Sequence, residues 1–214
     1  SDVYKRQMPP SASIALCDRL TASGMQPIDA PVSGGSVKAL AGEMSIMASG
    51  DPKAFERAAP ALEAITSKVF RLGNTPGMGS QVKMINQLLS GVHIAATAEA
   101  LTLGAKIGID LQQHYDVICE CAGSSWMFEN RGAHIVAGDY TPHSAVDIFV
   151  KDLGIVASEA EEAGCRTPLT TASLALFHQA SAAGLGREDD SAVAKVLAAS
   201  ANVSLPGVST AEKS

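Results

Sequence analysis

Four polar residues at helical spacing form the part of this sequence that is best suited to chemistry. Within the stretch GMGSQVKMINQLLSGVHIAAT, residues 77–97, positions i, i+3, i+4 and i+7 are Lys83, Asn86, Gln87 and Ser90. This spacing puts all four on one face of a helix. A lysine can hold or release a proton, and its pKa moves readily when it is buried. Carboxamides donate and accept hydrogen bonds, so Asn86 and Gln87 can hold the carboxylate and hydroxyl groups of a substrate.

The same stretch also fits an ordinary amphipathic helix whose polar side faces water. Its apolar residues recur at the helical period and are Val82, Ile85, Leu89, Val92 and Ala96. On periodicity alone, a solvated polar face is the more common meaning of such a pattern. The catalytic interpretation of the stripe therefore needs support from elsewhere in the chain.

A glycine turn provides a second candidate site. The segment QPIDAPVSGG, residues 26–35, predicts a strand that runs into the tight turn Ser33-Gly34-Gly35. Taken alone, such a turn most often only reverses the chain. Because glycine has no Cβ, its backbone N–H groups can approach an anion closely. Together with the polar stripe, we interpret the turn as a place for an acidic group of the substrate.

These residues sit on elements of two kinds. Residues 9–73 predict, in order, a helix, two strands, a helix started by Asp51-Pro52 and a further strand, as in the later part of an α/β sheet domain. A long helix over 80–108 follows, and every later segment predicts a helix. We expect a leader at 1–8 that is disordered or not native, a sheet domain at 9–75, an all-α substrate or dimerisation domain at 76–201 and a flexible tail at 202–214.

Composition excludes several classes of protein. The 214 residues carry a net charge of −6 and contain no basic run, which argues against binding a nucleic acid backbone. We find no uncharged apolar stretch of about 18 residues, so we expect no membrane span. Four cysteines without metal-ligand spacing predict reduced thiols, no metal site and a cytoplasmic protein. Two acidic pairs, Glu161-Glu162 and Asp189-Asp190, are expected to be solvated at helix surfaces or starts.

Three motifs together resemble the β-hydroxyacid dehydrogenase family, which includes 3-hydroxyisobutyrate dehydrogenase. They are DAPVSGG at 29–35, GMGSQVKMINQ at 77–87 and FVKDLG at 149–154. The resemblance extends over residues 9–200, and the combination of motifs at this spacing is specific. Further segments, including SWMFENR and REDDSAV, are most similar to the branch of the family that oxidises L-threonate, a four-carbon sugar acid, at C2 with NAD.

The resemblance implies a fold and a set of roles. The fold would be a Rossmann-like nucleotide-binding domain followed by an all-α domain, with a long helix between them. Lys83 would be the catalytic lysine, and Ser33, Gly34 and Gly35 would hold the substrate carboxylate. Asn86 and Gln87 would face the substrate. Lys151 would reach the cofactor or close the site, and the cofactor would be NAD, with NADP as the alternative. Without the resemblance, Lys151-Asp152 would be an exposed helix pair. The family also implies a homo-oligomer.

Two departures from the family pattern qualify these roles. Many members have two asparagines where this chain has Asn86-Gln87, so a substrate other than 3-hydroxyisobutyrate is favoured. No GxGxxG turn occurs anywhere in the sequence, and Gly77-Met78-Gly79 follows the sheet instead of opening it. We therefore expect an N-terminally truncated member that is inactive alone. Two alternatives stay open: a reductase of the glyoxylate or tartronate-semialdehyde type, and a non-catalytic helical oligomerisation fragment.

Overall fold

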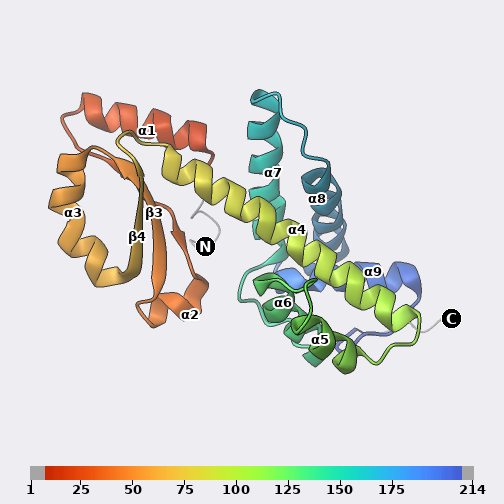
Figure 1. The fold of residues 1–214 in the computed structure, drawn as a ribbon. Coiled ribbons are helices and arrows are strands. Elements are labelled where there is room, and N and C mark those ends of the chain that lie inside the picture. Colours follow the sequence, from red (N-terminus) through yellow and green to blue (C-terminus); the bar gives the residue numbers. More distant parts are fainter. Residues whose placement is uncertain (1–7, 209–214) are drawn as a thin grey trace. The chain divides into compact units, whose positions relative to one another are not determined.

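The structure is a computed structural model that describes residues 8–208, apart from the side chains at 36 and 37. The chain forms two compact units (Figure 1). The first contains the residues up to Gln87 together with Ser158–Gly164, and the second contains Leu88–Ala157 and the residues from Cys165 onwards. Each unit is described by itself. The expected leader at 1–8 lies outside the described residues except for Met8.

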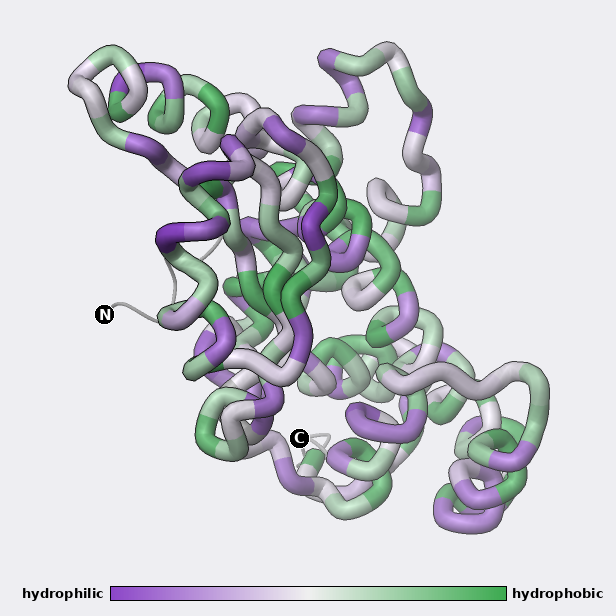
Figure 2. The backbone as a smooth tube through the Cα atoms, turned by 60° about the vertical axis from the view of Figure 1, so that its left-hand side comes forward, coloured by the Kyte–Doolittle hydropathy of each residue, from purple (hydrophilic) through white to green (hydrophobic). Residues whose placement is uncertain are grey.

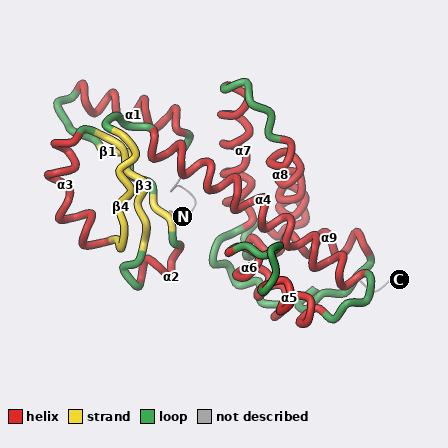
Figure 3. Tube along the Cα trace, viewed as in Figure 1, coloured by secondary structure: helices red, strands yellow, loops and turns green. Residues whose placement is uncertain are grey.

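The first unit is a small sheet with helices. Its elements are α1 (Pro10–Ala22), β1 (Ile28–Asp29), β2 (Val32–Ser33), α2 (Gly35–Leu40), β3 (Met44–Gly50), α3 (Pro52–Ile65) and β4 (Thr66–Gly73) (Figure 3). The α3 helix starts as its sequence predicts, because the Asp51 carboxylate accepts a hydrogen bond from the Lys53 N–H. Ile46 and Ala48 of β3 form a small core with Phe55 of α3.

Strand β3 organises this sheet. It pairs with β4 in parallel on one edge, and with β1 and β2 antiparallel on the other. Asp29 lies opposite Ser49, and Ser33 lies opposite Ser45. Between β1 and β2, the carbonyl of Pro31 still accepts from the Met47 N–H at 3.0 Å. The two short strands are thus one edge, broken at a residue that has no N–H to donate.

The α/β order expected for residues 9–73 is confirmed, with one difference. The single strand expected over 26–35 is two strands of two residues each, and a short helix, α2, begins directly at Gly35. The prediction missed α2 because the glycine pair was interpreted only as a turn. Gly34 and Gly35 have φ angles of +139° and +66°, which turn the chain from the strand into the helix.

The long helix predicted after the sheet is α4 (Met78–Lys106). Its start is pressed against the sheet: a Cβ on Gly79 would lie 2.3 Å from the Met47 carbonyl oxygen and 2.8 Å from that of Asp29. Among the described residues, α4 alone is long and apolar enough to cross a membrane. Half of its most apolar window is buried, and the core helices of many proteins that do not span membranes meet the same criterion.

The second unit is helical, as expected. Beyond α4 its elements are α5 (Leu111–Cys119), α6 (Trp126–Ala137), α7 (Val146–Glu162), α8 (Pro168–Ala180), the kinked turn η2 (Ser181–Leu185), the 3₁₀ turn η3 (Asp190–Ala192) and α9 (Val193–Ala201). Asp110 and Ser125 cap α5 and α6 through their side chains. Hydrophobic and hydrophilic residues alternate along the helices (Figure 2), as amphipathic helices require. Phe149 and Phe177 stack in the core with ring centroids 5.2 Å apart.

The chain beyond α9 continues to pack. We expected a flexible tail from residue 202, but Leu205 is 2% exposed and belongs to the core of the helical unit. Asn202, with φ at +51°, turns the chain back over the helices. The lack of helical periodicity after 201 was therefore a poor guide, because Val203, Leu205 and Val208 pack against the core without forming a helix. Residues 209–214 lie outside the described part of the chain.

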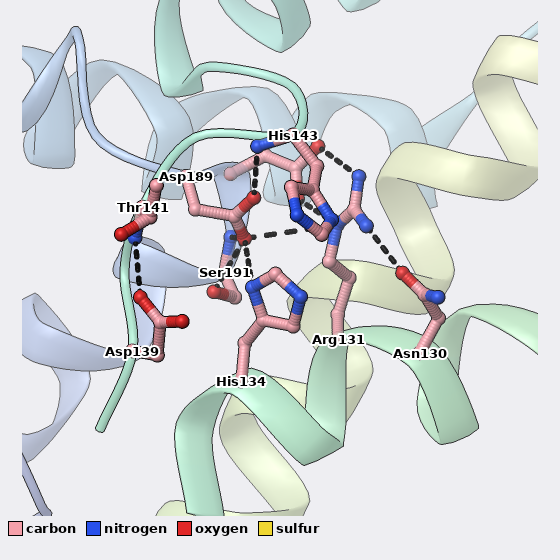
Figure 4. Close-up of polar contacts among 9 residues, drawn as sticks. Asn130, Arg131, His134, Asp139, Thr141, His143, Asp189 and Ser191 are labelled. Carbon is pink, nitrogen blue, oxygen red and sulfur yellow. Dashed lines mark hydrogen bonds and ion pairs between the residues drawn. The ribbon is translucent and has the colours of Figure 1, made fainter. Parts of the chain in front are cut away.

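A charged network is buried inside the second unit (Figure 4). Arg131 of α6 makes a two-pronged ion pair with Asp190, Nε to Oδ1 at 2.5 Å and Nη2 to Oδ2 at 3.2 Å. Neighbouring Asp189 accepts from the Ser191 hydroxyl at 2.6 Å and from the His143 N–H at 3.0 Å. Both aspartates are 0% exposed. The expectation that Asp189-Asp190 is a solvated helix start is wrong, because both carboxylates tie η3 to α6 and to the loop before α7.

Burial changes the acid–base behaviour of this network. Burial raises the pKa of Asp190 to about 6, although Arg131 works in the opposite direction. Burial also lowers the pKa of His134, whose Nδ1 lies 3.4 Å from Asp189 Oδ1, while Asp189 works against that shift. The folded protein therefore favours neutral His134, and it stabilises the charged form of Arg131 beside its two carboxylates.

We predict that Arg131→Met lowers the free energy of unfolding by about 3–5 kcal/mol at pH 7.5, since it leaves buried carboxylates without their cation. Urea titration of the 214-residue chain, followed by circular dichroism, measures this. The matched control is Arg57→Met on α3, where Arg57 is exposed and bonds only to Gln26 among the contacts described. The control is expected to change stability by less than about 0.5 kcal/mol. Equal effects of the two substitutions would contradict a stabilising role for the network.

His134 predicts a pH dependence of stability. Its folded pKa lies below the unfolded value of 6.5, so its contribution is present above pH 6.5 and is lost as the pH falls below it. Asp190 acts in the opposite sense, because its raised pKa removes stability as the pH rises from about 4 to about 6. A variant separates the two effects. Between pH 7.5 and pH 5.5, the free energy of unfolding of His134→Gln should fall by less than that of the parent chain. Parallel losses in urea titrations at both pH values would show that His134 does not titrate as described.

Candidate functional site

Three residues of the polar stripe of α4, all in the first unit, form a connected group. Lys83 Nζ donates a hydrogen bond to Gln87 Oε1 at 2.7 Å, and Asn86 Nδ2 donates to the same oxygen at 3.0 Å. All three side chains are half-buried. Further along the helix Ser90 is 8% exposed. The stripe is thus not the fully solvated face that periodicity alone favoured. Two of its side chains, Lys83 and Asn86, donate to the carbonyl oxygen of a third, Gln87.

This arrangement has a definite chemical character. The carbonyl oxygen of Gln87 accepts a hydrogen bond from Lys83 Nζ, so Gln87 helps to fix the position of that nitrogen. The side chain is long enough to reach Lys83 one helical turn away and Asn86 next to it. The extra methylene of Gln87, compared with asparagine, serves this double contact.

The glycine turn lies in the same unit, at the end of β2. Ser33 is half-buried and pairs with Ser45 of β3. A Cβ on Gly34 would lie 2.7 Å from the Cβ of Lys38, and Gly35 has a left-handed φ of +66°. Both positions thus require glycine, for different reasons. A turn of this kind exposes successive backbone N–H groups, which is a common way of binding anions.

Lys151 belongs to the other unit. It lies on α7, where its Nζ is 2.9 Å from Asp152 Oδ1. The side chain of Lys151 is 33% exposed, whereas Asp152 is 2% exposed. The exposed helix pair expected without the resemblance is therefore not found, because Lys151 is half-buried and Asp152 is buried. The structure brings Lys83, Asn86 and Gln87 together; the contact of Lys151 with the cofactor stays a prediction.

The glycines at the start of α4 do not fit a dinucleotide. The N–H groups of Gly77 and Ser80 donate to the Asp29 carboxylate at 3.1 and 2.8 Å, and that of Gly79 donates to the Ser49 hydroxyl at 3.1 Å. A carboxylate already occupies the place where a helix start would receive a pyrophosphate. This agrees with the interpretation that Gly77-Met78-Gly79 is not the nucleotide-binding turn.

Two groups of residues escaped the sequence reasoning. The Arg131 network combines buried charges with shifted pKa values, which is typical of functional sites. Its carboxylates are however engaged by partners of the same unit, so its geometry is that of a structural ion-pair cluster.

Among residues 8–208, no set of His, Cys, Asp or Glu side chains is placed to hold a metal ion. Asp29 was also missed, although it is the first residue of the DAPVSGG motif.

Comparison with known proteins agrees with these motifs. Residues 77–197 match the model of a family described as the NAD-binding domain of NADP-dependent 3-hydroxyisobutyrate dehydrogenase. Residues 7–73 match the NAD-binding domain of 6-phosphogluconate dehydrogenase. The chain is 58% identical to L-threonate dehydrogenase of Escherichia coli O6:H1 over 188 residues, which are 88% of this chain and 61% of that protein. It therefore spans about three fifths of the length of this relative.

Solved structures show the same relationship. A crystal structure of 3-hydroxyisobutyrate dehydrogenase from Salmonella typhimurium matches with a TM-score of 0.84 and 55% identity, over 88% of this chain and 66% of that one. A structure of Psf3 in complex with NADP⁺ and 2-OPP matches with a TM-score of 0.81 and 26% identity, over 89% and 66%. These matches extend over both the sheet and the helices described above.

The family model covers more than half of the chain, and it includes the polar stripe of α4 as well as Lys151. On this ground, and with the α/β sheet followed by helices that both solved relatives share, the chain belongs to the 3-hydroxyisobutyrate dehydrogenase family of NAD(P)-binding dehydrogenases.

Proposed function

We propose that this chain is the substrate-binding and proton-transferring part of an NAD(P)-dependent dehydrogenase of small hydroxy acids, with L-threonate, oxidised at C2, as the favoured substrate. The observation that carries the proposal is the convergence of Lys83 and Asn86 on the carbonyl of Gln87. Lys83 is half-buried and hydrogen-bonded, and the two amide side chains beside it can form hydrogen bonds with hydroxyl groups. The identity of 58% to an L-threonate dehydrogenase supports the substrate.

In this proposal each group has a defined task. The backbone N–H groups of Ser33-Gly34-Gly35 bind the carboxylate of the hydroxy acid, and the amides of Asn86 and Gln87 hydrogen-bond its hydroxyls. Lys83, as a neutral amine, takes the proton of the hydroxyl that is oxidised. When bound, the nicotinamide cofactor supplies the hydride acceptor. In the reverse reaction the Lys83 ammonium gives its proton to the carbonyl oxygen.

One observation favours the reductive direction as a second candidate. Because Gln87 accepts a hydrogen bond from Lys83 at 2.7 Å, it holds Nζ as a hydrogen-bond donor, which is the role of the lysine in reduction. A reductase of a small aldehyde acid, of the glyoxylate or tartronate-semialdehyde type, would use the same residues. Turnover of L-threonate with NAD⁺, compared with turnover of these aldehyde acids with NADH, separates the two.

The location and assembly of the protein are part of the same proposal. Free thiols at Cys17, Cys119, Cys121 and Cys165 and bacterial relatives support a cytoplasmic enzyme. A homo-oligomer is expected from the family. A non-catalytic helical fragment is the remaining alternative, and cofactor binding tests it.

We predict that the 214-residue chain binds NADH weakly or not at all, since the glycine turn at α4 is closed by Asp29. Titration of NADH fluorescence measures this. The comparison is an extended protein, in which the chain follows the N-terminal part of the E. coli O6:H1 relative. This extended protein should bind NADH. Tight binding by the chain alone would mean that it contains a pyrophosphate site that we have not recognised.

We predict that Lys83→Ala in the extended protein lowers kcat by about 100-fold or more, the range expected for loss of a general acid or base. Steady-state oxidation of L-threonate at pH 8 measures this, with unchanged circular dichroism as evidence of folding. Lys53→Ala on α3 is the matched control, because Lys53 is exposed. It should leave kcat within about threefold of the parent value. Near-normal turnover of Lys83→Ala would remove Lys83 from the mechanism.

A further inference from the structure

One buried carboxylate holds the start of α4 in place. Asp29, at the end of β1, is 6% exposed. Its Oδ1 accepts from the hydroxyls of Ser13 and Ser80 at 2.8 and 2.6 Å. Its Oδ2 accepts from the N–H groups of Gly77 and Ser80 at 3.1 and 2.8 Å, and the Ser49 hydroxyl lies at 3.4 Å. Five donors from separate parts of the first unit thus meet on one side chain.

This carboxylate acts as the N-terminal cap of α4, although it lies far away in the sequence. The first N–H groups of a helix have no partner within the helix and carry partial positive charge. Here Asp29 takes those of Gly77 and Ser80, while Ser49, its partner across the sheet, takes that of Gly79. No side chain fits at Gly79, where a Cβ would lie 2.3 Å from Met47 O. These contacts therefore fix both the rotation of α4 about its axis and the distance of its first turn from the sheet.

Both parts of the proposed site, the glycine turn and the polar residues of α4, lie close in sequence to this contact between Asp29 and α4. Ser33 follows Asp29 by four residues along the edge of the sheet, and Lys83 follows Ser80 by three residues, on the same face of α4. We propose that Asp29 is a positioning residue for catalysis: it sets the register of α4 on the sheet, and so places Lys83 relative to the glycine turn. This inference rests on the proposed function of those two elements.

The chemistry of the partners makes Asp29→Asn an informative variant. The Oδ2 position faces backbone N–H groups, which can only donate, and the amide oxygen of asparagine can accept from them. The Oδ1 position faces the hydroxyls of Ser13 and Ser80, which can rotate to accept from the amide NH₂. Asparagine therefore keeps the geometry and loses the charge, whereas alanine loses both.

The test uses the extended protein and L-threonate oxidation. A displacement of about 1 Å costs about 100-fold in rate, so Asp29→Ala should lower kcat about 100-fold, and Asp29→Asn should restore it to within about threefold of the parent. Ser13→Ala is the matched control. Ser13 lies on α1, so this variant removes a donor from the same carboxylate without changing a residue of α4 or of the turn. It should lower the urea midpoint and leave kcat within about threefold.

The outcomes separate this inference from the proposed function. If Lys83→Ala keeps its turnover, the proposed function fails. If Lys83→Ala loses turnover while folded Asp29→Ala keeps kcat within threefold, only the positioning role is overturned. Loss of kcat in Ser13→Ala as large as in Asp29→Ala would also overturn it, because general destabilisation would then explain both. Should Asp29→Ala fail to fold, Asp29→Glu decides: its longer side chain should shift α4 and lower kcat more than tenfold, and a parent-like kcat would overturn the inference.

Discussion

The first unit depends on one electrostatic interaction, the contact of a buried carboxylate with the positive end of a long helix. Burying a carboxylate is costly unless hydrogen bonds replace its water. Asp29 receives such bonds from a strand, two helices and the turn before α4. The same hydrogen bonds fix the position of the first turn of α4, the helix that carries Lys83, against the sheet. The same contact occupies the N–H groups of Gly77 and Ser80, so this helix start is not open to a phosphate.

The second unit solves a similar problem with a cation. Arg131 lies between two aspartates that are fully buried, and the serine and histidine partners of Asp189 complete the cluster. Both units thus use buried acidic groups to fix helix starts, α4 in one case and the η3–α9 segment in the other. The difference lies in what they hold: the first carries the candidate chemistry, and the second fixes the scaffold of the helices.

Local features of the sequence were enough to predict most elements. Periodicity and capping residues such as Asp51, Asp110 and Ser125 act within a few residues, so they can be recognised without a structure. The stripe of Lys83, Asn86 and Gln87 was predicted for the same reason. The contacts of Asp29 and Arg131 were not, because their partners lie 51 and 59 residues away. An aspartate pair looks the same in a sequence whether it is solvated or buried.

The distance along the chain between Asp29 and Ser80 also has a kinetic meaning. Ser80 lies 51 positions after Asp29, and β2, α2, β3, α3 and β4 lie between them. Contacts of such long range form late because a large loop must first be closed. The donors that meet on Asp29 come from α1, β3, α4 and the turn before α4, so this cap forms only when these separate segments have come together. The start of the helix that carries Lys83 therefore depends on contacts from across the first unit, and not on its own sequence alone.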